Sequence, residues 1–259
     1  MRQPALFLSH GAPTFLLEEN ATTRFWQSLP NLLPVKPRAV LCVSAHWEAP
    51  QFCISGTLGK TGIQHDFYGF PDALYDIDWS ECENKETSAW LLTRMRELKV
   101  TVAEEGYPKD HGVWVPLKTA WPSPEFPVYQ LSLNLAQGLE AHWVLGQQLQ
   151  SLRDDGVLLV GSGGITHNLR AVDWHAPVGA AAPWASAFVA ALEQAMKEND
   201  RVSLCKPWHF PYGKECHPTI EHYAPLLFVL GAANGEPVRK IHESWMSATL
   251  SLNAYGAGL

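Results

Sequence analysis

The sequence at residues 5–11, Ala5-Leu-Phe-Leu-Ser-His10-Gly11, shows a pattern that occurs three times in this chain: a short apolar run followed closely by a histidine. Residues 41–48 read Leu-Cys-Val-Ser-Ala-His46-Trp-Glu, and residues 158–168 read Leu-Leu-Val-Gly-Ser-Gly-Gly-Ile-Thr-His167-Asn. Short apolar runs of this kind are typical of strands covered on both faces. Ligands of open α/β sheets bind outside the carboxyl ends of the strands, so the pattern predicts three imidazoles on one rim.

Strands and helices are expected to alternate along the rest of the chain. Periodicity and turn residues predict strands at 5–9, 39–44, 52–55, 128–133, 157–161 and 249–252. They predict helices at 22–33, 85–98, 140–153, 183–199 and 219–230. Such alternation indicates an α/β layered fold, and no repeat or linker interrupts it, so we expect a single domain over residues 1–259.

Composition excludes several classes of protein. The chain has 259 residues, 46% hydrophobic residues, 17% charged residues and a net charge of −7. This is too apolar for disorder, and without a Lys/Arg cluster we expect neither nucleic acid nor an anionic membrane as a partner. No apolar run is long enough for a membrane span or a signal peptide. The five cysteines contain no C-x-x-C pair, so a cytoplasmic location with reduced thiols is expected.

Imidazole is the commonest metal ligand in proteins, so His10 and His46 are candidate ligands. A third candidate lies in the stretch His217-Pro-Thr-Ile-Glu-His222. Positions five apart on a helix point in different directions, so only one of these two histidines is expected to join the site. Glu215 and Glu221 are the carboxylate alternatives.

Two further segments carry candidate pocket residues. Asp110-His111-Gly112 precedes an apolar run and fits either a pocket loop or a surface turn. His65-Asp-Phe-Tyr-Gly-Phe-Pro is an aromatic loop that predicts a substrate lid, although a loop histidine bonded to Asp66 explains His65 equally well. Aromatic residues near these motifs suit a ring-shaped substrate: Trp47, Phe67, Tyr68, Trp114 and Tyr223.

Taken in order along the chain, the motifs resemble those of the LigB-type (class III) extradiol ring-cleavage dioxygenases, and most closely the 4,5-DOPA dioxygenase group. The resemblance implies an α/β/α layered fold with a mixed central sheet and a metal site at the carboxyl ends of strands. It also implies one mononuclear divalent metal held by His10, His46 and His222, with His167 in or next to its coordination sphere. In this family the histidine of the Asp-His-Gly motif lines the substrate pocket, which points to His111.

The leading hypothesis is therefore a non-haem dioxygenase that opens the ring of a catechol such as L-DOPA by 4,5-cleavage with O2. Fe(II) is the metal expected for activity, and Zn(II) is the metal expected after purification. His167 is expected to act mainly on protons, with His111 hydrogen bonding to the substrate or oxygen. The residues expected to bind the substrate are His65, Phe67, Tyr68, Trp47 and Tyr223.

Two alternatives stand beside this hypothesis. An all-nitrogen site also suits a zinc-dependent hydrolase, in which Glu48 or Glu221 would serve as the base. A non-catalytic binder of small molecules is the second alternative. It would leave buried imidazoles without a role, at a cost in stability.

Overall fold

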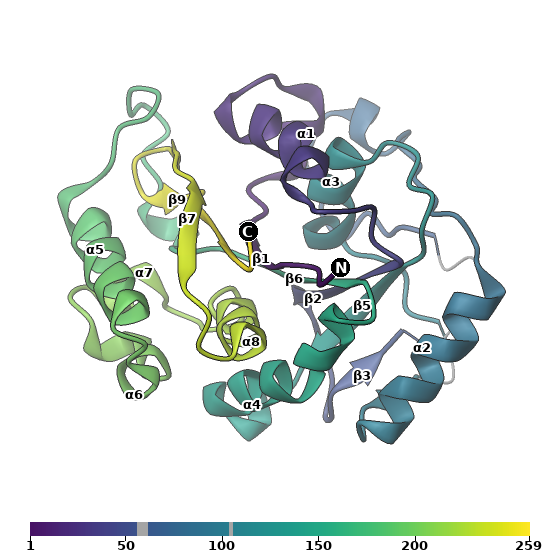
Figure 1. Cartoon of the computed structure of the whole chain (residues 1–259). Coiled ribbons are helices and arrows are strands. Elements are labelled where there is room, and N and C mark those ends of the chain that lie inside the picture. Colours follow the sequence, from purple (N-terminus) through teal and green to yellow (C-terminus); the bar gives the residue numbers. More distant parts are fainter. Residues whose placement is uncertain (56–61, 104–105) are drawn as a thin grey trace.

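A mixed eight-stranded sheet lies at the centre of the computed structural model, which describes residues 1–55, 62–103 and 106–259 (Figure 1). The strand order is β4-β3-β5-β2-β6-β1-β10-β7. The strands are β1 (Ala5–Ser9), β2 (Ala39–Glu48), β3 (Cys53–Ile54), β4 (Thr101–Val102), β5 (Val128–Leu133), β6 (Val157–Gly163), β7 (Val238–His242) and β10 (Ala254–Ala257). The neighbours β5, β2, β6 and β1 run parallel, so their carboxyl ends meet at one edge. A separate pair joins β8 (Trp245–Met246) and β9 (Leu250–Ser251).

Helices cover both faces of this sheet (Figure 1). The α-helices are α1 (Ala21–Leu32), α2 (Lys85–Glu97), α3 (His111–Ala120), α4 (Leu139–Leu149), α5 (Pro183–Lys197), α6 (Arg201–Leu204), α7 (Gly213–Cys216) and α8 (Ala224–Ala233). Short 3-10 helices are η1 (Pro13–Leu17), η2 (Asp72–Leu74), η3 (Leu135–Gln137), η4 (Gln150–Arg153), η5 (Leu169–Ala171) and η6 (Pro207–His209). Within the described ranges, no helix combines the length and the apolar character that crossing a membrane requires.

The side chains of β1 show how the core is divided. Ala5 and Phe7 belong to the cluster that α4 and α8 help to form, whereas Leu6 and Leu8 belong to the cluster of α1 and α3. Successive residues of a strand point to opposite faces, so each face of the sheet has its own apolar layer. The α/β/α layered fold with a mixed central sheet is therefore confirmed.

Helix α8 lies unusually close to both of its neighbours, because glycines face it on the sheet and on α4. A Cβ atom on Gly161 of β6 would lie 2.3 Å from the carbonyl oxygen of Pro225, and one on Gly163 would lie 2.2 Å from that of His222. On the other side, a Cβ atom on Gly146 of α4 would lie 2.0 Å from the carbonyl oxygen of Phe228. Every residue of α8 is buried.

The structure corrects the expected start of this helix. We expected a helix at 219–230, but α8 begins at Ala224, after a bend at 218–220 and a turn at 221–223. Proline is favoured in the first turn of a helix, where no N–H is needed, and both Pro218 and Pro225 fit that pattern. The helix uses Pro225. His222 consequently lies in the turn that precedes the helix.

Two other expectations also need correction. Residues 249–252 were expected to close the sheet, but β9 pairs with β8, and β10 is the strand that joins β1 to β7. Little in Ala254-Tyr-Gly-Ala257 favours a strand locally, and its partner β1 lies at the other end of the chain.

The segment after Asp110 is a helix and not a pocket loop. Asp110 caps α3, because its Oδ1 accepts the N–H of Val113. Gly112 and Pro116 made the segment resemble a loop. Pro116 has no N–H, so the carbonyl of Gly112, four residues earlier, has no helical hydrogen-bond partner.

Gly161→Ala should destabilise the protein by about 1–3 kcal/mol, because a methyl group there must push α8 away from β6. Gly164→Ala is the matched control, since its Cβ would meet nothing closer than 3.4 Å, and it should change stability by less than about 1 kcal/mol. Urea denaturation of both variants measures the difference. Equal midpoints for the two variants would show that the close packing of β6 on α8 is not as described.

Candidate metal centre

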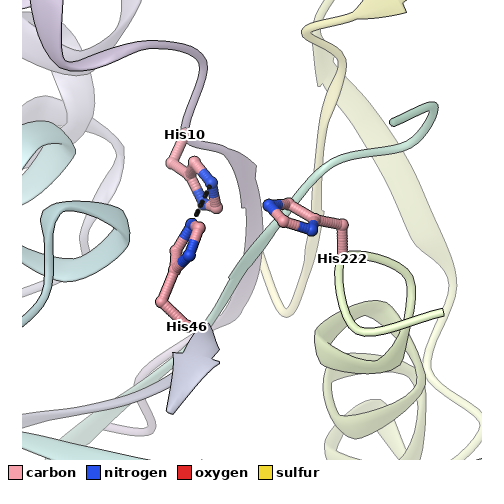
Figure 2. Close-up of side chains that lie close together, drawn as sticks. All are labelled: His10, His46 and His222. Atoms are coloured by element: carbon pink, nitrogen blue, oxygen red, sulfur yellow. Dashed lines mark hydrogen bonds between the residues drawn. The ribbon is translucent and has the colours of Figure 1, made fainter. Parts of the chain in front are cut away.

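Three histidine side chains converge at the carboxyl edge of the parallel strands (Figure 2). His10 directly follows β1, His46 lies near the end of β2, and His222 precedes α8. The ring centroids of His46 lie 4.9 Å from those of both His10 and His222, and the other pair is 5.3 Å apart. One ring nitrogen from each residue lies within 4.8 Å of the other two.

Hydrogen bonds fix the orientation of the His10 ring. Its Nδ1 lies 2.9 Å from Oγ of Ser162, and that hydroxyl donates its hydrogen to the free carbonyl of Gly112. The oxygen of Ser162 must therefore accept the Nδ1 hydrogen, which leaves the lone pair of His10 on Nε2. This Nε2 faces Nε2 of His46 at 3.1 Å.

His222 is oriented in the same way from the other side. Its Nδ1 donates to Oε1 of Glu221 at 3.0 Å, because a carboxylate only accepts. Its Nε2 is buried and has no hydrogen-bond partner among the described residues. The main-chain carbonyl of His222 accepts the N–H of Gly164 at 2.9 Å, which holds the turn against the end of β6.

Burial keeps these rings neutral. Desolvation lowers the pKa of His10 and of His222 well below the usual value, and the neighbouring imidazoles lower both further. Desolvation also lowers the pKa of His46 to about 3. A neutral imidazole carries the lone pair that a metal ion needs.

The donor set fits a divalent metal. Two nitrogens that bind one ion at about 2.1 Å lie roughly 3 Å apart, as the Nε2 atoms of His10 and His46 do. Hydrogen bonds from the opposite ring nitrogen to an acceptor are the usual support of metal-bound histidines. The unpartnered, buried Nε2 of His222 is the third observation, because such an atom is costly without a ligand.

The structure answers the choice within the stretch 217–222. His217 is buried elsewhere, with its Nε2 donating to the carbonyl of Ile165 at 2.8 Å. His222 is the residue brought to His10 and His46. Among the carboxylates, Glu221 supports His222, whereas Glu48 is exposed at the end of β2.

His167 lies directly beside the three histidines. Its ring stacks on that of His222, with centroids 3.4 Å apart and an angle of 7° between the planes. Its main-chain N–H donates to the carbonyl of Cys216 at 2.8 Å. Desolvation lowers the pKa of His167 to about 4. The ring is therefore neutral at neutral pH and able to accept a proton.

His111 is the first residue of α3, and its ring lies 4.1 Å from that of His46, centroid to centroid. Asp66 accepts hydrogen bonds from both the main-chain N–H and the ring Nδ1 of His111, each at 2.9 Å. Burial alone would raise the pKa of Asp66, but the hydrogen bonds that its carboxylate accepts from His111 outweigh burial and lower that pKa. We had considered Asp66 only as a partner of His65, whose Nε2 instead donates to the carbonyl of Ile77.

A cavity of about 620 Å³ opens above these rings, a size typical of small-molecule sites. Five histidines line it: His10, His46, His111, His167 and His222. Large apolar side chains form much of the remaining wall: Phe67, Phe70, Leu169, Trp174 and Met246. The cavity therefore presents nitrogen donors at its base and an apolar, partly aromatic wall.

The aromatic loop 65–71 reaches this cavity through Phe67 and Phe70. Tyr68, in the same loop, points into solvent and is 93% exposed. Tyr68, expected to bind the substrate, therefore does not line the cavity. Phe70 belongs to the same motif and could have been chosen with Phe67, but sequence alone does not tell which aromatic residues of a loop turn inward.

Three other residues assigned to substrate binding lie outside the cavity wall. Trp47 stacks on Tyr107, with ring centroids 4.3 Å apart. Tyr223 is fully buried, and its hydroxyl donates to the carbonyl of Leu204 at 2.8 Å. His65 packs edge-on against Phe67, one layer behind the cavity. Trp47 and Tyr223 directly follow His46 and His222 in sequence, but neither side chain is among those that line the cavity.

The residues that orient the imidazoles were not predicted from the sequence. Ser162 holds the His10 ring, and nothing in the stretch Gly161-Ser-Gly-Gly164 indicates this. Its role depends on β6 lying beside β1, where it pairs with Leu8. Leu169 and Trp174 follow His167 in a segment without any chemical motif, and no local signal identified them as cavity residues.

The fold and site together define an α/β enzyme with a histidine-built, metal-compatible centre beneath an aromatic cavity. Residues 4–258 match the family described as the catalytic LigB subunit of aromatic ring-opening dioxygenase. The chain therefore belongs to the LigB family and is an extradiol ring-opening dioxygenase. Enzymes of this family are metal-dependent and act on a small aromatic molecule with O2.

Individual relatives agree with this membership. A 4,5-DOPA dioxygenase extradiol of Escherichia coli (strain K12) is 38% identical over 256 residues, which cover 92% of this chain and 88% of the relative. A protein of the same name from Beta vulgaris is 33% identical, covering 96% of this chain and 94% of that one. The crystal structure of an uncharacterized Escherichia coli K12 protein superposes with a TM-score of 0.80 at 33% identity, covering 99% of this chain and all of that one (100%).

Replacing His10, His46 or His222 with Ala should leave a folded protein that retains little metal, because each removes one nitrogen from a three-nitrogen site. His209→Ala is the control, since His209 is exposed and remote from the cavity wall. Metal content per chain, measured after dialysis against one equivalent of divalent metal, checks the prediction. Full retention in His222→Ala, with loss in Glu221→Ala or His217→Ala, would show that the third ligand is misassigned.

Proposed function

We propose that this enzyme cleaves the ring of a catechol such as L-DOPA between carbons 4 and 5, with both atoms of O2 entering the product. The convergence of His10, His46 and His222 at the base of an aromatic cavity is the observation that carries this proposal. The names of the relatives in Escherichia coli and Beta vulgaris support the substrate class.

We infer that His10, His46 and His222 hold one divalent metal, with Fe(II) required for turnover. The ion held by these three residues would supply Lewis acidity toward the phenolic oxygens, and a site with only three protein ligands would leave room for a catechol and dioxygen. Zn(II) binds nitrogen sites more tightly than Fe(II), so protein purified without added iron is expected to contain Zn(II). Membership of a ring-opening family favours this function over a zinc-dependent hydrolase.

Other residues of the cavity are suited to proton transfer and to substrate binding. His167 is neutral and close to His222, so it is suited to take a proton from the catechol and to return one during ring opening. A position as a fourth ligand is the alternative for His167. His111 is placed to hydrogen bond with the substrate or oxygen, and Phe67 is placed to pack against the ring.

Protein loaded anaerobically with Fe(II) and then exposed to air and L-DOPA should consume oxygen and form a yellow semialdehyde. Simple catechol and the Zn(II)-loaded protein serve as comparisons, and the latter should be inactive. Oxygen consumption with an electrode and the visible spectrum measure the outcome. Absence of oxygen uptake with every catechol tried would overturn the proposal.

His167→Ala should lower turnover by about 10²–10⁴-fold, the usual contribution of a general acid–base group. The variant should keep its metal and still bind catechol, whereas His111→Ala should cost less in turnover. Metal content measured beside steady-state oxygen uptake separates the two roles. If His167→Ala loses metal as readily as His10→Ala, His167 is a ligand and its assignment as a proton carrier is wrong.

A further inference from the structure

Asp66 makes an unusual pair of hydrogen bonds with a single neighbour. Its Oδ1 accepts the main-chain N–H of His111, and its Oδ2 lies 2.9 Å from Nδ1 of the same residue. The first contact ties Asp66 to the N-terminal turn of α3, and the second fixes the rotation of the imidazole. Both side chains are largely buried, at 20% and 11% exposure.

This pairing determines which nitrogen of His111 carries the hydrogen. A carboxylate only accepts, so the ring hydrogen of neutral His111 must be on Nδ1. Nε2 is then the lone-pair nitrogen, on the ring edge that points away from Asp66. His111 lines the cavity, with its ring centroid 4.1 Å from that of His46 and 5.4 Å from that of His10.

Asp66 also anchors the loop that supplies the apolar wall. Phe67 follows it directly and contacts the His111 ring edge-on, with centroids 6.0 Å apart. The same carboxylate thus sets the position of an imidazole and of the aromatic side chain beside it.

We propose that Asp66 is a positioning residue: it holds His111 in the Nδ1–H tautomer so that Nε2 accepts a hydrogen bond from a hydroxyl of the bound substrate. The substrate hydroxyl in this statement rests on the proposed catechol function, whereas the tautomer does not. Carboxylate–histidine pairs of this kind are known to control tautomer and ring orientation in enzymes, and replacing the carboxylate by an amide costs up to about 10⁴-fold in turnover.

A second reading of the same residues is a metal site, because one donor atom each from His46, Asp66 and His111 lies within 4.8 Å of the others. Both oxygens of Asp66 already accept hydrogen bonds from His111, and this arrangement favours the pair over a metal site. Metal stoichiometry distinguishes the two readings: the proposal expects one ion per chain.

Asp66→Asn is the decisive variant. Asn has one acceptor oxygen, which the main-chain N–H of His111 can still use, while its NH2 group would donate to Nδ1. The ring of His111 should therefore change to the Nε2–H tautomer. Long-range ¹H–¹⁵N correlation spectra of the apo protein report this change directly, with His111→Gln used to assign the signals. Asp72→Asn, in an exposed residue a few positions along the chain, is the matched control and should keep the native tautomer.

With Fe(II) bound, Asp66→Asn should lower kcat by about 10²-fold, and by no more than His111→Ala does, while metal content stays unchanged. Asp66→Glu should recover part of this loss, because it restores a second acceptor. If Asp66→Asn keeps the Nδ1–H tautomer, or if the native protein binds two ions per chain and the variant one, the proposal is wrong. If the tautomer changes as expected but no catechol is oxidised by the native protein, the positioning role stands and the proposed function fails.

Discussion

His222 reaches the metal centre because the chain around it lies almost in contact with the backbone of β6. Its carbonyl accepts the N–H of Gly164, and the space beside Gly163 is too small for a methyl group. Helix α8 follows directly and is pressed into the same strand at Gly161. Without side chains at these positions, the turn can place its imidazole opposite those of His10 and His46. The geometry of the site therefore depends on close backbone packing in the layer beneath it.

The part of this structure that could be predicted from the sequence is the part set by local pattern. Strands β1 and β5 were predicted at their observed bounds, and His10 and His46 followed from the rule that ligands lie at the carboxyl ends of strands. Strand β10 and the partners Ser162 and Asp66 were not predicted. Their roles depend on contacts between segments that are far apart in the sequence. The periodicity of a single segment carries no information about such contacts.

The imidazoles of the centre are largely buried, and burial keeps them neutral. Removing His10, His46 and His222 from water disfavours their charged forms, and one nitrogen of His222 has no partner among the described residues. An ion that binds only the folded chain stabilises it through mass action. The three ligands come from three separate elements, so such an ion would also cross-link β1, β2 and the turn before α8. Binding of the proposed ion would thus be coupled to folding.

Pro116 lacks a main-chain N–H, and this affects the hydrogen bonds of His10 in another element. In a regular helix the residue at this position would donate to the carbonyl of Gly112 and would compete with the hydroxyl of Ser162 for that oxygen. Because proline cannot donate, that oxygen accepts from Ser162, whose lone pair in turn accepts from His10. Proline in α3 thus leaves the Gly112 carbonyl fully available to Ser162, and Ser162 determines which nitrogen of His10 carries the lone pair. A residue outside the cavity wall thereby favours the tautomer in which Nε2 of His10 faces the histidine cluster.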